Sequence, residues 1–154
     1  MREFNERLKE FIVRAKAATY IGGGKESRSC RPGSHDLEFH EKDFKYLDSY
    51  FGGADFIGEE VVYFEEKPAW AMNYYGRILK PERITAEETG KILKKSLSHL
   101  YLENRFLGGY KFIDGRDTYF DVNEGNPEVF NGTEWIERDG ERVYELTYHG
   151  GLIK

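Results

Sequence analysis

The chain contains 154 residues with a formal net charge of −5, and 16% of its residues are aromatic. This length suits one domain with a buried core. A single cysteine excludes an internal disulfide bond and a metal site built from several cysteines. The acidic balance disfavours contact with phosphate groups, which needs clustered lysine and arginine, so we expect no direct binding of nucleic acid.

Residues 3–18 carry apolar side chains at helical spacing and predict a helix that ends at Gly22. The chain opens directly into this pattern without the features of a signal peptide, which predicts a cytoplasmic protein. No apolar run approaches the roughly 20 residues that a membrane-spanning helix needs, so we expect no membrane partner. A polar loop is predicted over residues 22–34, where the sequence reads GGGKESRSCRPGS.

Alternating apolar and polar residues follow from His35 and predict antiparallel strands over residues 35–52 and 58–78. A second helix is predicted to begin at Thr85, because Thr85 and Glu88 have the spacing of a capping box. Beyond it, Asp114-Gly115 and Asp139-Gly140 are dipeptides that favour hairpin turns. Helix, strands, helix and strands in this order predict an α+β fold, with two helices packed on a curved antiparallel sheet.

The two parts of the chain also resemble each other in sequence. Three pairs of segments match: Phe56-x-Gly58-x-Glu60 with Phe130-x-Gly132-x-Glu134, Trp70-x-Met72-x-Tyr74 with Tyr144-x-Leu146-x-Tyr148, and Tyr46-x-Asp48 with Tyr119-x-Asp121. They predict a single domain over residues 1–154 with repeated halves at 1–80 and 81–154. Chance similarity between sheets made of hairpins is the alternative explanation.

Glu60 is the first candidate for a functional side chain. It shares a strand face with Val62 and Phe64, so it is predicted to point inward, where a carboxylate needs a partner or a raised pKa. Within an aromatic pocket, such a group can hold a cationic or hydrogen-bonding ligand. An internal ion pair with Arg31, Arg77 or Arg105 is the alternative explanation of the same residue, and both interpretations stay open.

A polar cluster at residues 31–40 supplies further candidates. Asp36 and His40 share a strand face, but one strand supplies too few ligands for a metal ion, and we expect neither a metal nor a cofactor. Ser34 and His35 are adjacent on a strand and point to opposite faces, so they cannot act together as nucleophile and base.

Aromatic residues of the fourth predicted strand are the other part of the expected site. An excess of tyrosine is typical of pocket or interface walls. Asn73, Tyr75 and Arg77 share one strand face, opposite the face of Trp70. No residue is predicted to be catalytic. The predicted ligand-binding set is Arg31, Ser34, His35, Asp36, Glu60, Trp70, Asn73, Tyr75 and Arg77.

Several longer stretches match a pattern seen in one family. They are ATYxGGG (18–24), RPGSHDL (31–37), DSYxGG (48–53), GEE (58–60), WAMNYYGR (70–77) and HGGLIK (149–154). Together they resemble a bacterial domain-of-unknown-function family, number 5680. The resemblance implies a protein that occurs alone or after the helix-turn-helix domain of XRE-type transcriptional regulators, and it transfers no catalytic residues.

We therefore expect a non-enzymatic domain that binds a small molecule or senses an effector, linked to transcriptional regulation through the resemblance. Two other functions stay open. One is a small enzyme that uses His35, Asp36 and Glu60 as acid, base or metal-binding groups. The other is an interaction module that forms a homodimer through an aromatic face or an edge of its sheet.

Overall fold

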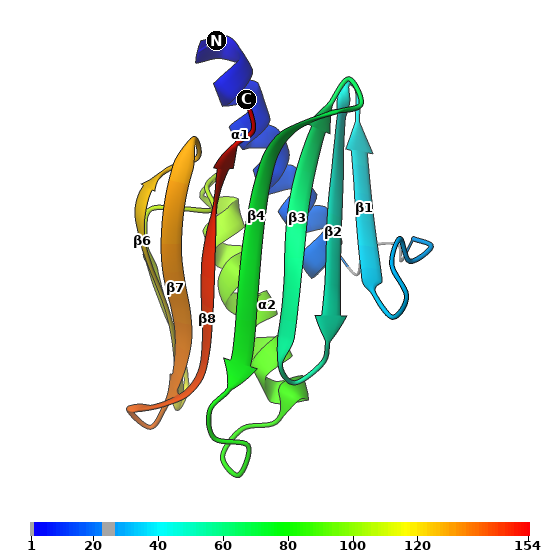
Figure 1. Ribbon diagram of the computed structural model, residues 1–154. Coiled ribbons are helices and arrows are strands. Elements are labelled where there is room, and N and C mark those ends of the chain that lie inside the picture. Colours follow the sequence, from blue (N-terminus) through cyan, green and yellow to red (C-terminus); the bar gives the residue numbers. More distant parts are fainter. Residues whose placement is uncertain (1, 23–26) are drawn as a thin grey trace.

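A computed structural model describes residues 2–22 and 27–154 (Figure 1). The first helix, α1 (Arg2–Lys16), continues into one wider turn, η1 (Ala17–Ile21), and the second helix is α2 (Ala86–Leu102). Thr85 Oγ1 accepts the backbone N–H of Glu88, and the Glu88 carboxylate accepts the backbone N–H of Thr85. The predicted capping box is thus confirmed. Residues 23–26 of the predicted loop lie outside the described residues.

Eight antiparallel strands form one sheet in the order β1-β2-β3-β4-β8-β7-β6-β5. Their bounds are β1 (His35–Glu41), β2 (Phe44–Gly52), β3 (Phe56–Phe64), β4 (Lys67–Ile78), β5 (Tyr110–Asp114), β6 (Asp117–Asn126), β7 (Val129–Arg138) and β8 (Glu141–Leu152). The two predicted hairpins are confirmed, since Gly115 lies between β5 and β6 and Gly140 lies between β7 and β8. Strands β4 and β8 pair at the centre and join the two halves of the sheet.

The predicted fold class, α+β with two helices packed on a curved sheet, is wrong. Strands make up about half of the chain and all belong to one continuous sheet, so the protein is mostly β. One helix is N-terminal, and each helix lies mainly over one flank of the sheet. Helix α1 approaches β1 and β2, and α2 approaches β5 and β6. The sequence suggested an α+β class because both helices are visible in its local pattern. The β4–β8 ladder, which joins all strands into one sheet, is instead a contact between distant segments.

The two halves place equivalent residues at equivalent positions. Tyr74 lies opposite Tyr148 in the middle of the β4–β8 ladder. On one side of this centre, Asp48 lies opposite Glu60, and on the other, Asp121 lies opposite Glu134. The structure therefore has approximate two-fold symmetry about the central ladder. Common descent of the halves at 1–80 and 81–154 stays a prediction.

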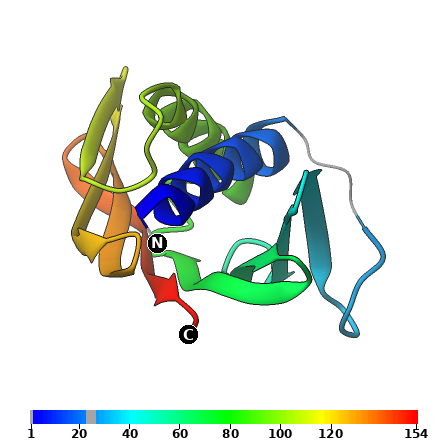
Figure 2. The same ribbon diagram turned by 90° about the horizontal axis from the view of Figure 1, so that it is seen from above.

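The core lies on the concave face of the sheet, on the side where both helices are seen in Figure 2. Phe11 of α1 stacks on Phe44 at a centroid distance of 4.9 Å. Trp70, which is fully buried, stacks on Phe130 at 5.8 Å and meets Phe106 edge-on. These rings fill the space at one end of the concave face. Among the described residues, no helix is long and apolar enough to cross a membrane.

Candidate functional site

A cavity of about 550 Å³ lies between the inner face of the sheet and the segments α1, η1 and α2. Three exposed residues also line it: Gly52, which ends β2, Gly53, which follows it, and Lys94 of α2. Nine aromatic side chains line it: Tyr20, Tyr46, Tyr50, Phe56, Tyr74, Tyr101, Phe106, Tyr119 and Tyr148. A cavity of this size and composition is typical of a small-molecule site.

Four buried carboxylates line the same cavity: Asp48, Glu60, Asp121 and Glu134. Each is less than 10% exposed and comes from a different strand. Strand alternation explains their direction, because each shares its face with core residues two positions away, as Glu60 does with Val62. Among the described residues, no three metal-binding side chains lie close enough together to hold a metal ion. The carboxylates thus form two cross-strand pairs, Asp48 with Glu60 and Asp121 with Glu134, and no three of them converge on one point.

A tyrosine binds the aspartate in each half. The Tyr74 hydroxyl donates to Asp48 Oδ1 at 2.6 Å, and the Tyr148 hydroxyl donates to Asp121 Oδ1 at 2.6 Å. Each tyrosine reaches across the intervening strand to do so, because β3 lies between β4 and β2, and β7 lies between β8 and β6.

Glycine makes this crossing possible. Gly58 lies opposite Tyr74, and Gly132 lies opposite Tyr148. A Cβ atom at either glycine would collide with the hydroxyl and ring of the tyrosine opposite it. The repeated Gly-x-Glu segments of the sequence therefore have a physical explanation: the glycine lets the phenol pass, and the glutamate two residues later faces the cavity.

The two glutamates have different partners. Lys16 Nζ lies 2.5 Å from Glu60 Oε2, and both side chains are buried. The same ammonium group lies 5.6 Å from the centre of the Phe106 ring. Glu134 instead accepts a hydrogen bond from the hydroxyl of Tyr119 at 2.6 Å and a longer one from Tyr144 at 3.4 Å. Glu60 thus has the Lys16 ammonium group beside it, whereas Glu134 has two tyrosine hydroxyls.

Asp121 is incompletely satisfied. Its Oδ1 atom accepts from Tyr148, but Oδ2 is buried and has no hydrogen-bond partner among the described residues. A buried carboxylate oxygen that lacks a partner is unfavourable by about 1–3 kcal/mol or more. The positive charge of Arg105 acts on Asp121 through space, but its guanidinium is hydrogen-bonded to Glu103 and to backbone carbonyls.

Burial shifts the titration of these groups toward neutral pH. It raises the pKa of Asp48 to about 7, and the neighbouring Glu60 carboxylate adds to the rise. It also raises the pKa of Glu134 to about 7 against the opposing effect of the Tyr119 hydrogen bond. The pKa of Asp121 is raised for the same reason. These carboxylates can therefore gain or lose a proton when a charged ligand binds near neutral pH.

The sequence from Asp48 to residue 153 matches a protein family described as a domain of unknown function, DUF5680. The chain belongs to this family. The resemblance predicted from the sequence is thus confirmed. All four cavity carboxylates lie within the matched residues, whereas Lys16 precedes them. No curated protein and no solved structure matches the chain.

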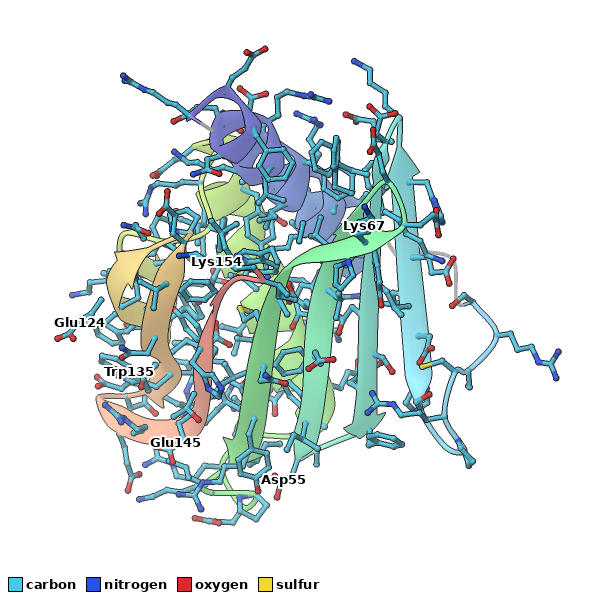
Figure 3. The ribbon with its side chains drawn as sticks, turned by 45° about the horizontal axis from the view of Figure 1, so that its top comes forward. Asp55, Lys67, Glu124, Trp135, Glu145 and Lys154 are labelled. Atoms are coloured by element: carbon cyan, nitrogen blue, oxygen red, sulfur yellow. The ribbon has the colours of Figure 1, made fainter. Side chains whose placement is uncertain are left out.

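Of the nine ligand-binding residues predicted from the sequence, Glu60 alone lines the cavity of this DUF5680 domain. Trp70 is fully buried beside the cavity and donates from Nε1 to the carbonyl oxygen of Pro127. Asn73, Tyr75 and Arg77 lie on the outer face of the sheet, where Arg77 pairs with Glu145 at 2.8 Å. Figure 3 labels Glu145, and next to it Trp135, on this face.

The remaining four residues gather at the outer end of β1. The buried Asp36 carboxylate accepts from the Cys30 backbone N–H and the Ser49 hydroxyl, and Arg31 donates to that hydroxyl. Ser34 closes the turn that follows Arg31 by donating to its carbonyl oxygen at 2.9 Å. These contacts hold the loop before β1 against the sheet.

His35 is exposed and stacks on Tyr50 at 5.0 Å. Asp36 faces the outer side of the sheet and Glu60 the inner side, so the structure does not bring together the groups that the enzyme alternative would use. The ligand-binding roles of the nine residues stay predictions.

Sequence reasoning missed Lys16, Asp48, Asp121 and Glu134 as a set around one cavity. The internal repeat was the available signal. It already paired Asp48 with Asp121 and Glu60 with Glu134, so the repeated polar residues were the ones that face the cavity.

Proposed function

We propose that this DUF5680 domain binds a small organic cation in its cavity. The single observation that supports this most is the wall itself, in which four buried carboxylates are interleaved with nine aromatic side chains. Carboxylates attract an ammonium group, and the faces of aromatic rings favour a cation and its apolar body. Lys16 is the one buried basic side chain among the described residues of the wall, so negative charge is in excess there.

The spacing of the acids favours an organic ion over a bare metal ion. A metal ion needs several donors at one point, and the described residues contain no such group. An organic cation can instead place its charge at one carboxylate and its body against the rings. An effector-sensing role linked to transcription would rest on such binding and stays a prediction.

A matched series of six-carbon compounds tests the proposal. Hexylamine, 1-hexanol and hexanoate have similar apolar bodies and differ in charge. We expect hexylamine to raise the melting temperature of the protein and to bind measurably by calorimetry, and we expect hexanol and hexanoate to bind more weakly. Equal binding of all three, or preference for hexanoate, contradicts a cation site.

The binding should also depend on pH. Burial raises the pKa values of Asp48, Asp121 and Glu134, and a bound cation favours the ionised form of the carboxylate that it contacts, so binding of hexylamine releases a proton. The affinity should therefore rise between pH 6 and pH 8, where the amine itself remains charged. An affinity that is unchanged or falls over this range would exclude these carboxylates as the attracting groups.

A further inference from the structure

The approximate symmetry of the cavity is broken at the positive charge. In the N-terminal half, Lys16 lies 2.5 Å from Glu60 with its ammonium group near the Phe106 ring. A buried ammonium paired with a carboxylate and an aromatic face is the arrangement that a bound amine would adopt. Lys16 thus fills the cation position of its own half from within the chain.

The C-terminal half has the same acids without a cation in contact with them, since Lys16 acts on Glu134 and Arg105 acts on Asp121 only through space. Asp121 and Glu134 occupy the register of Asp48 and Glu60, yet no described lysine or arginine makes an ion pair with either. Tyrosine hydroxyls satisfy both oxygens of Glu134 and one oxygen of Asp121. The other oxygen of Asp121, Oδ2, is the buried atom that lacks a partner among the described residues.

Asp121 therefore meets the requirements of an anchor. It is 5% exposed, it lines the cavity, and it has one unused acceptor. Leu97, Leu100 and Leu146 line the same cavity and can contact an apolar body. A second ammonium group on the ligand would have to enter the half where Lys16 already lies, and like charges would repel.

We propose that the cavity selects a primary monoamine with an apolar body, whose ammonium group binds Asp121 in the way that Lys16 binds Glu60. This inference rests on the proposed function. It adds that the ligand has one positive charge and that this charge lies at the Asp121 end of the cavity. The Lys16 ammonium group already occupies the position beside Glu60, so the second ammonium group of a diamine cannot bind there.

Two isosteric variants give a matched comparison, because Asp48 and Asp121 have the same tyrosine partner geometry in opposite halves. The probes are hexylamine and 1,6-diaminohexane, measured by calorimetry on the full chain at pH 8. We expect Asp121→Asn to weaken hexylamine binding at least tenfold and Asp48→Asn to weaken it less than threefold. Wild type should prefer hexylamine over the diamine.

A third variant tests the role of Lys16. Lys16→Met empties the cation position at Glu60, so we expect the affinity for 1,6-diaminohexane relative to hexylamine to rise at least tenfold. If this variant does not fold, as circular dichroism would show, the two aspartate variants still decide the question.

The outcomes separate the two proposals. If no amine binds wild type, the proposed function fails and this inference fails with it. If hexylamine binds but Asp48→Asn weakens it as much as Asp121→Asn, or the diamine binds wild type more tightly, the site is a cation site and the inference is overturned.

Discussion

The two halves of the cavity present the same acids on the same scaffold but stabilise them differently. Glu60 lies beside a buried ammonium group, whereas Glu134 lies beside two phenols. The tyrosine–aspartate pairs and the glycines opposite the tyrosines occur in both halves. The repeated strands thus fix the positions of the four carboxylates. Residues outside the repeated pattern, such as Lys16, determine whether a carboxylate is paired with a positive charge or with tyrosine hydroxyls.

Removal of the ammonium group should produce the largest effect. Lys16→Met leaves the Glu60 carboxylate buried without its cation, and breaking a buried ion pair from one side lowers the free energy of unfolding by about 3–5 kcal/mol.

Tyr119→Phe removes one neutral hydrogen bond from Glu134 and should lower the free energy of unfolding by about 1–3 kcal/mol. Urea unfolding at pH 7 measures both, and adding Glu60→Gln to Lys16→Met should restore part of the loss. A larger loss in Tyr119→Phe than in Lys16→Met would contradict the comparison.

The pH dependence of stability should report on the buried Glu134 carboxylate of the C-terminal half. The folded-state pKa of Glu134 is about 7 and its ordinary value is 4.5, so between these values the unfolded chain binds fewer protons than the folded one. Stability from this group is therefore present below pH 4.5 and is lost as the pH rises to about 7, by on the order of 3 kcal/mol.

Glu134→Gln removes that titration and can still accept from Tyr119. We expect this variant to be more stable than wild type at pH 8 and to lose less stability between pH 5 and pH 8, as followed by urea unfolding at each pH. Glu60→Gln should instead lower stability at pH 8, because it leaves Lys16 buried without a carboxylate. A pH profile of Glu134→Gln that is identical to that of wild type would show that Glu134 is ionised throughout.

Effects smaller than the loss of the Lys16 ammonium group should come from the glycines that the tyrosines cross. Gly58→Ala and Gly132→Ala each place a methyl group where the opposite tyrosine lies, and overpacking of this kind costs about 1–3 kcal/mol. Gly90 in α2 has open space at its Cβ position, so Gly90→Ala is the matched control and should stabilise by up to about 1 kcal/mol. Thermal unfolding compares the three, and equal effects would show that neither crossing is tight.

Local features of the fold could be predicted from the sequence. The Thr85 cap and the two hairpin turns depend on neighbouring residues, and their chemistry is visible in a few letters. The inward direction of Glu60 followed from strand alternation. The dominance of the sheet could not be predicted in this way, because it depends on β4 pairing with β8, about 75 residues later in the chain.

The candidate site was only partly predictable for a similar reason. Lys16 is four residues from Ile12 on a helix, and a lysine at the end of an apolar stripe reads as exposed until Glu60 is known to lie beside it. Alternation also places Asn73, Tyr75 and Arg77 together without showing that their face of the sheet is the outer one. A homodimer and the absence of nucleic-acid binding stay predictions.

The central β4–β8 ladder has a consequence for how the cavity can change. If the two halves were identical separate chains that paired through this ladder, any lysine placed beside one acidic pair would also appear beside the other. Because one polypeptide carries both halves, a single substitution alters only one end of the cavity. The covalent link between Ile78 and Ala86 thus allows the two ends of the cavity to differ, so that a ligand can bind in one direction only. A symmetric assembly of two identical chains could not distinguish the two directions.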